Sequence, residues 1–289
     1  VFLNQKLSII KILTLLKRKK MIHHTLEFKG TNLHYQDEGN GDIVLVLIHG
    51  FMTDLRVWSS YVFSYMRDIR VVTIDLLGHG HSGWLEDTPS TMELQAEAVK
   101  EVLDYLGINE CVMVGHSMGG YVSLAFAEAY PQYIKGLCLL HSHALADGNN
   151  VKEKRQQTCE IINKNRASFI INFIPNLFAP ASRDKYYYEI KDLQDSALDS
   201  KADGLILAQK GIATRTSKIE LLKTLNTPIL FIIGKQDPRI SFDMAIAQAS
   251  LPKHSEVLIL ENVGHMGHIE ARDIIKQRLL SFTYSCFAF

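Results

Sequence analysis

The chain has 289 residues, of which 47% are hydrophobic and 21% are charged, and its 31 basic and 31 acidic side chains cancel. This composition is ordinary for one large globular domain, and it excludes the positive charge excess expected of a nucleic-acid-binding protein. The four cysteines are too few and too scattered for a disulfide framework, so we expect a reducing, cytoplasmic setting. The spacings C-x-x-C and H-E-x-x-H are missing, so the sequence signals no metal site.

Residues 1–20 differ in composition from the rest of the chain. An apolar run at 9–16 precedes the basic stretch 17–20, which is the reverse of the order in a signal peptide. The run is also shorter than the ~20 apolar residues of a transmembrane helix, so we expect no stable membrane insertion. We interpret the segment as a poorly ordered extension before a domain that begins at Met21, with a basic helix on a membrane surface as the alternative.

From Met21 onward, strand patterns alternate with helix patterns. Two runs of alternating polarity around Gly30 predict a β-hairpin, and wholly apolar runs then predict strands that are buried on both faces. Those strands are predicted at 43–48, 70–75, 111–114, 134–140, 228–234 and 256–260, with helices at 58–66, 91–106, 121–130, 241–250 and 269–281. The alternation predicts an α/β fold with a mostly parallel eight-stranded sheet and helices on both faces.

The alternation stops near residue 143 and resumes near residue 218. Helices are predicted at 152–167 and 184–213, with an apolar, aromatic patch at 169–178. We predict that 143–217 form a helical lid inserted after the sixth strand, between the two parts of the core, 21–142 and 218–289. Phe173, Phe178 and His141 are candidates for an apolar substrate pocket. The alternative is that the two phenylalanines only attach the lid to the core.

A tight strand-to-helix turn is predicted at residues 115–119, which read Gly-His-Ser-Met-Gly. An apolar run precedes them and a helical pattern follows, which places a serine at the sharpest point of the turn. The positions two before and two after that serine must be small, because the two backbones nearly touch there. Gly115 and Gly119 meet this need, and Ser117 then stands at the start of a helix whose free N–H groups favour negative charge.

A serine hydroxyl needs a base to become nucleophilic, and the base needs an acid to orient it. His265 follows the last predicted strand, and Asp237 follows the strand before it. The carboxyl ends of parallel strands meet at one edge of the sheet, so we expect both side chains near Ser117. The predicted roles are nucleophile for Ser117, general base and then acid for His265, and orientation of the imidazole for Asp237. Asp75 also ends a strand and is the alternative acid, but chain order favours Asp237.

Two backbone N–H groups are candidates for stabilising an oxyanion. One belongs to Met118, directly after the serine, and the other to Phe51, in the loop after the first buried strand. We expect His49 to brace that loop by hydrogen bonding and His116 to pack inside the sharp turn. The oxyanion would then be held by main-chain dipoles alone.

Taken together, residues 21 to about 280 resemble the α/β-hydrolase superfamily, in particular its lid-containing serine hydrolases. The matching stretches are HGF at 49–51, DLLGHGHS at 75–82, GHSMGG at 115–120, GKQD at 234–237 and GH at 264–265. The chain order serine, aspartate, histidine is also that of the superfamily. These stretches are specific for the fold and the catalytic residues, and only weakly specific for the substrate.

The resemblance implies a serine hydrolase that cleaves a small or medium carboxylic ester or lactone through an acyl-enzyme, as carboxylesterases and enol-lactonases do. It implies no cofactor and no metal, a small-molecule substrate, and no nucleic-acid partner. A carbon–carbon bond hydrolase, a lyase, a perhydrolase and a slow-turnover receptor are similar to this sequence too, and they stay open as alternatives. Monomer and homodimer are both compatible with the sequence.

Overall fold

A computed structural model describes residues 21–288 of the protein. Residues 1–20, interpreted above as an extension, lie outside the described residues. Within 21–288, no helix combines the length and the apolar character needed to cross a membrane.

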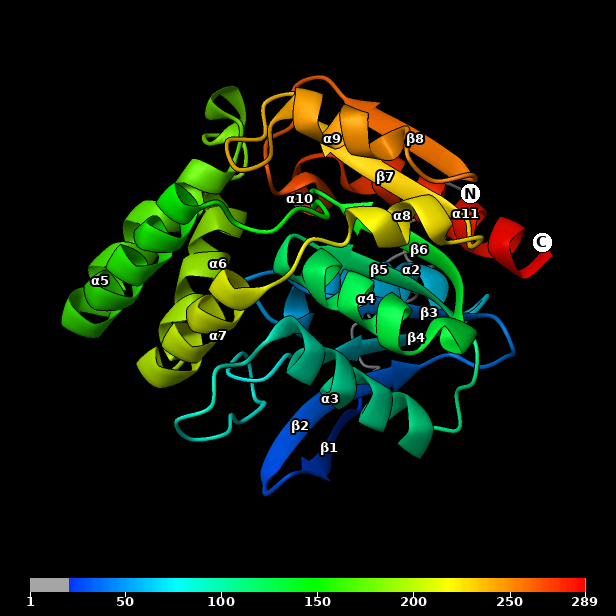
Figure 1. The fold of residues 1–289 in the computed structure, drawn as a ribbon, viewed down its shortest axis with the longest axis horizontal. Coiled ribbons are helices and arrows are strands. Elements are labelled where there is room, and N and C mark those ends of the chain that lie inside the picture. Colours follow the sequence, from blue (N-terminus) through cyan, green and yellow to red (C-terminus); the bar gives the residue numbers. More distant parts are fainter. Residues whose placement is uncertain (1–20, 289) are drawn as a thin grey trace, which may run out of the picture.

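An eight-stranded sheet forms the centre of the molecule, in the order β1-β2-β4-β3-β5-β6-β7-β8 (Figure 1). The strands are β1 (His23–Phe28), β2 (Thr31–Glu38), β3 (Val44–Ile48), β4 (Arg70–Ile74), β5 (Cys111–His116), β6 (Ile134–Leu140), β7 (Ile229–Gly234) and β8 (Ser255–Leu260). β1 and β2 pair antiparallel, and β2 also meets β4 antiparallel, whereas β4, β3 and the strands from β5 to β8 run parallel. The predicted α/β class and the mostly parallel eight-stranded sheet are confirmed.

Helices cover both faces of this sheet, because successive strand residues point to opposite sides. In β3, Val46 and Ile48 pack in the layer formed by α3 and α4, while Leu45 and Leu47 pack in the layer formed by α2 and α11. Figure 1 shows α3 and α4 in front of the strands. The core helices are η1 (Leu55–Trp58), α2 (Ser59–Tyr65), α3 (Met92–Tyr105), α4 (Met118–Ala129), η2 (Pro131–Tyr133), α8 (Ile219–Thr224), α9 (Phe242–Ala249), α10 (Gly267–Glu270) and α11 (Arg272–Ala288).

A helical insertion lies between β6 and β7, at the left of Figure 1. It consists of α5 (Asn149–Phe173), η3 (Ile174–Leu177), η4 (Pro180–Ser182), α6 (Tyr187–Asp199) and α7 (Ala202–Thr214). Its apolar side chains pack with Met52 and Met266, in the loops after β3 and β8, and with Ile269 of α10. The insertion is therefore seated on the edge of the sheet where the parallel strands end.

Two details of the insertion differ from the prediction. The single helix expected at 184–213 is two helices, because the backbone is extended at Ser200 (φ −65°, ψ 147°) and at Lys201 (φ −83°, ψ 143°). The aromatic patch expected after the first helix is mostly its continuation, since α5 runs to Phe173 with one non-helical residue at Asn165. At Gly204 in α7, an added Cβ would lie 2.7 Å from the Cα of Gly78, so the insertion touches the core backbone there.

Candidate active site

The turn between β5 and α4 is as tight as its glycines predict. Ser117 sits at φ 53° and ψ −113°, a backbone conformation that a non-glycine residue adopts only under strain. A Cβ at Gly115 would lie 2.3 Å from the carbonyl oxygen of Gly119, and a Cβ at Gly119 would lie 2.5 Å from that of Ile48. Neither position tolerates a side chain without backbone movement. The amide of Ser117 donates to the carbonyl oxygen of Leu140 (3.0 Å), which ties the turn to β6.

The structure brings Ser117, His265 and Asp237 together in one hydrogen-bonded chain. Nε2 of His265 lies 2.9 Å from Oγ of Ser117, and Nδ1 of His265 lies 3.0 and 2.9 Å from the two carboxylate oxygens of Asp237. With Nδ1 donating to the carboxylate, Nε2 is left as the acceptor for the serine hydroxyl. The three side chains come from the ends of β5, β7 and β8, the edge where the sequence placed them.

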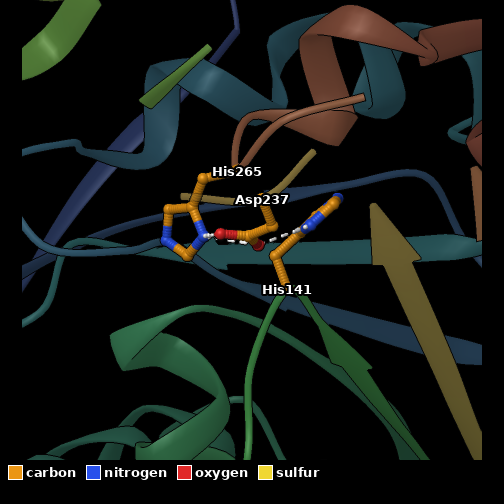
Figure 2. Close-up of side chains that lie close together, drawn as sticks. All are labelled: His141, Asp237 and His265. Atoms are coloured by element: carbon orange, nitrogen blue, oxygen red, sulfur yellow. Dashed lines mark hydrogen bonds and ion pairs between the residues drawn. The ribbon is translucent and has the colours of Figure 1, made fainter. Parts of the chain in front are cut away.

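Asp237 is held in the ionised state by its surroundings. One carboxylate oxygen accepts from the amides of Arg239 (2.8 Å) and Ile240 (3.0 Å), and the other faces Nδ1 of His141 (3.0 Å). Burial alone would raise the pKa of Asp237, but the charge of His265 and the hydrogen bonds from His141 and His265 hold it well below its usual range. Figure 2 shows the carboxylate between the two imidazole rings.

His141 therefore lies behind the acid, whereas the sequence suggested that it lines the pocket. Its backbone is left-handed (φ 48°), which turns the side chain inward toward Asp237. The ring fills the space over Gly267, where an added Cβ would lie 2.1 Å from Nε2 of His141. A histidine at the end of a strand was the only signal in the sequence, and that signal does not say which way the ring points.

The described residues include one group that could hold a cation, formed by His141, Asp237 and His265, whose ligand atoms lie within 4.8 Å of one another. Both Nδ1 atoms already face the carboxylate at hydrogen-bonding distance. A cation there would break the bond that orients His265. Hydrogen bonds to Asp237 already occupy Nδ1 of both histidines.

Two further buried histidines position the His265 loop. Nε2 of His116 donates to the carbonyl oxygen of His265 (2.9 Å), and the ring of His268 lies against that of His116, with centroids 4.4 Å apart. Burial, reinforced by the neighbouring histidines, holds the pKa of both His116 and His268 well below the usual value. Both rings are therefore neutral, and His116 packs inside the turn as expected.

The two residues predicted to supply oxyanion donors line the same cavity as the serine. Phe51 and Met118 both line it, and Met118 is the first residue of α4, so its N–H has no acceptor within the helix. His49 braces the loop before Phe51: Nδ1 donates to the carbonyl oxygen of Gly50 (2.8 Å), and Nε2 accepts from the amide of Leu76 (3.0 Å). The ring of His49 thus links the loop after β3 to the chain just after β4.

A cavity of about 650 Å³ opens above Ser117 and His265, with the insertion as its outer wall. Phe173 is half-buried in that wall, with its ring stacked on Phe169 at 5.1 Å. Besides these, the apolar lining includes Val151, Ile161, Leu177, Ile212, Ile240, Met244 and Met266. The cavity is therefore large enough for a small or medium substrate, and many of the side chains that line it are apolar.

Phe178 does not line this cavity, contrary to the expectation from the sequence. Its side chain is fully buried, with its ring 6.1 Å from that of Tyr186. The cause is a close approach of two backbones: a Cβ at Gly264 would lie 2.7 Å from the carbonyl carbon of Phe178, and the amide of His265 donates to Leu177 (2.7 Å). The chain at Phe178 is fixed against the His265 loop and points into the protein.

Comparison with known proteins identifies the class. The family model described as alpha/beta hydrolase fold matches residues 43–272, so the chain belongs to the α/β-hydrolase family. Among solved structures it is similar to a thermophilic esterase from Thermogutta terrifontis (TM-score 0.85, 26% identity, 92% of this chain and 99% of that one). It shares its fold with the enol-lactonase from Burkholderia xenovorans LB400. The TM-score is 0.82 at 22% identity, and the match covers 90% of this chain and 99% of that one.

Two curated relatives have different names. The chain is 30% identical over 250 residues to the dihydrolipoyllysine-residue acetyltransferase component of the acetoin cleaving system from Pseudomonas putida, covering 84% of this chain but only 64% of that protein. It is 24% identical over 270 residues to a 2-hydroxy-6-oxononadienedioate/2-hydroxy-6-oxononatrienedioate hydrolase from Paraburkholderia phymatum. This match covers 88% of this chain and 92% of that protein. The family and these likenesses define the protein as a hydrolase of the α/β fold.

Proposed function

We propose that the protein hydrolyses a small or medium carboxylic ester or lactone through an acyl-enzyme on Ser117. The observation that carries the proposal is the chain of hydrogen bonds from Asp237 through His265 to Oγ of Ser117, at the floor of the cavity. A carboxylate, an imidazole and a strained serine in this order are what nucleophilic attack on an acyl carbon requires.

In the first half of the reaction, Oγ of Ser117 attacks the carbonyl carbon of the substrate while its proton passes to Nε2 of His265. The ionised Asp237 stabilises the imidazolium that forms. The negative charge on the carbonyl oxygen meets the N–H groups of Met118 and Phe51; one such donor contributes about 10²–10³ in rate. His265 then protonates the leaving alkoxide, which departs as an alcohol and leaves the acyl group on the serine.

In the second half, a water molecule gives a proton to His265 and attacks the acyl carbon. The tetrahedral intermediate then collapses, the serine recovers its proton from His265, and a carboxylic acid leaves. A lactone follows the same path, with the alcohol retained in the product. We further propose that residues 143–217 act as a lid that limits the access of bulk water during these steps.

The test is labelling and turnover with matched serine variants. Wild-type protein should react with a fluorophosphonate and hydrolyse p-nitrophenyl esters, whereas Ser117→Ala should lose both, with turnover falling by several orders of magnitude. Ser64→Ala removes an exposed hydroxyl on α2 and serves as the control that should behave like wild type. Phosphonate labelling that persists in Ser117→Ala would refute the assignment.

A further inference from the structure

Part of the cavity lining consists of basic side chains, and we call this part the basic end. Lys154 and Arg155, both on α5, line it together with Arg239, which follows the turn that carries Asp237. Asp147 is the acidic side chain in the same lining. Three cations therefore face one carboxylate around a cavity that opens onto the serine, which is an unusual balance for a chain with no net charge.

The charge of Asp147 is already engaged within the protein. Its carboxylate is 2.7 Å from Nη2 of Arg215 and also accepts from Nε of Arg155, so one anion serves two guanidinium groups. Nη1 of Arg155 also donates to Oε1 of Gln209 (3.1 Å). Asp147 therefore cannot neutralise Arg239 or Lys154 as well.

Arg239 and Lys154 form no ion pair with any residue of the range 21–288. The guanidinium of Arg239 lies over the ring of Phe173, 5.4 Å from its centroid, which keeps it inside the cavity. Desolvation there lowers the pKa of Arg239, and the nearby charge of Arg155 lowers it further. Arg155 and Arg239 thus line one cavity that contains a single carboxylate, and an anionic ligand would add the negative charge that Arg239 lacks.

A neutral donor stands beside these cations. Nδ1 of His143 accepts from the amide of Leu145 (3.1 Å), so in the neutral ring Nε2 carries the proton and donates it to the hydroxyl oxygen of Tyr121 (3.1 Å). Burial, with the charge of Arg215, lowers the pKa of His143 to about 4, so the ring is neutral at pH 7. The hydroxyl hydrogen of Tyr121, which lines the cavity, is then available to a ligand.

We propose that this basic end of the cavity binds a carboxylate of the substrate, so that the ester or lactone cleaved at Ser117 carries a second, anionic group. The planar guanidinium of Arg239 suits two parallel hydrogen bonds to a carboxylate, with Lys154 and Tyr121 as supporting donors. The inference rests on the proposed hydrolysis for the reaction. For the substrate class it rests on the charge and hydrogen bonding of this end of the cavity alone.

The kinetic test uses two esters that differ only in charge at the far end: p-nitrophenyl hydrogen adipate, which is anionic, and p-nitrophenyl methyl adipate, which is neutral. The readout is the ratio of their kcat/KM values after subtraction of the enzyme-free rates. For the wild type we expect a ratio of about ten or more in favour of the anionic ester at low salt, because charge-assisted hydrogen bonds are stronger than hydrogen bonds between neutral groups. Since salt screens charges that remain open to solvent, the ratio should decline as salt is added.

Arg239→Gln should lower that ratio about tenfold, mainly through a higher KM for the anionic ester. Lys154→Gln should lower it less, because an exposed ammonium on a flexible stem is a weaker anchor. Arg67→Gln, which removes an exposed arginine just after α2 and outside the cavity, is the matched control and should keep the wild-type ratio. A wild-type ratio of one or less, or equal ratios in Arg239→Gln and Arg67→Gln, would overturn the proposal.

A binding experiment separates this inference from the proposed reaction. Calorimetry with adipate itself requires no turnover, and we expect wild-type and Arg67→Gln protein to bind it at least about tenfold more tightly than Arg239→Gln. If neither ester is hydrolysed but adipate binds in this order, the reaction assignment fails and the anion site stands. If both esters are hydrolysed and adipate binds all three proteins equally, the anion site fails and the reaction stands.

Discussion

Replacing Gly115 by alanine tests whether the strand and the helix around Ser117 are as close as the structure has them. The added Cβ would lie 2.3 Å from the carbonyl oxygen and 2.4 Å from the carbonyl carbon of Gly119, and 2.5 Å from the Cα of Gly120. An ordinary contact begins at 3.4 Å, so the backbones must separate by about 1 Å, the difference between 3.4 and 2.4. All three atoms belong to the main chain, so no side chain can turn away to make room.

The size of the effect follows from that displacement. Overpacking of this kind costs about 1–3 kcal/mol, which corresponds to a melting temperature lower by about 2–12 °C for a domain of this size. The same movement shifts Oγ of Ser117 relative to His265, and a misplacement of about 1 Å can cost about a hundredfold in rate. We therefore expect Gly115→Ala to lose both about 1–3 kcal/mol of stability and about a hundredfold in kcat/KM.

Calorimetric melting and kcat/KM for a p-nitrophenyl ester, measured on the same preparation, check both numbers. Gly148→Ala is the control for stability, because a Cβ at that position meets nothing within 4 Å and the change should be within about 1 kcal/mol. If Gly115→Ala kept wild-type melting and wild-type kcat/KM, the close contact between β5 and α4 would be wrong.

Three further predictions concern the pocket, the acid and the pH dependence of stability. Phe173→Ala should shift the preference toward bulkier acyl groups, because each methylene in an apolar pocket changes the discrimination between substrates by about 1–3 kcal/mol. Phe178→Ala removes a buried ring, so it should cost about 3–5 kcal/mol of stability and leave the preference unchanged. His141→Phe removes a donor to Asp237 worth about 1.5–3 kcal/mol, and kcat should fall about tenfold or more while KM stays near the wild-type value. Stability should decrease as the pH falls from 6.5 toward 4, because the pKa of His143 is about 4 in the folded protein and the unfolded chain takes up the proton first.

Each of these has a clear contrary result. An acyl-chain profile that changes in Phe178→Ala but not in Phe173→Ala would mean that Phe178, and not Phe173, lines the pocket. A change confined to KM in His141→Phe would mean that the ring contacts substrate and has no effect on Asp237. For His143, urea unfolding at several pH values should show a smaller loss in His143→Gln than in the wild type, by up to about 3 kcal/mol at pH 4; identical losses would show that the ring titrates normally in the folded protein.

The sheet and the positions of the three candidate catalytic side chains could be predicted because their signals are local. Each buried parallel strand is a short apolar run, and the residue after such a run must lie at the carboxyl edge of the sheet. Gly115, Gly119 and Gly264 indicate sharp turns from the sequence alone, which is why Ser117 and His265 were expected side by side, as the structure has them. The acid followed from chain order, which separated Asp237 from Asp75.

The directions of side chains in irregular backbone could not be predicted in the same way. His141 points toward Asp237 because its φ is positive, and a histidine at a strand end gives no hint of that angle. Phe178 is buried because the His265 loop crosses its backbone, a contact between residues 86 apart at Phe178 and Gly264. Arg239 and Lys154 meet at one cavity only after α5 has folded over the sheet. Such features depend on long-range packing that no periodicity records.

The most direct test of the central claim is the fate of Ser117 during turnover. Wild-type protein mixed with excess p-nitrophenyl ester and quenched in acid within milliseconds should carry one acyl group, and peptide mapping should place that group on Ser117, with a burst of p-nitrophenol close to one equivalent of protein. An unmodified serine during sustained hydrolysis, or an acyl group on another residue, would contradict the account.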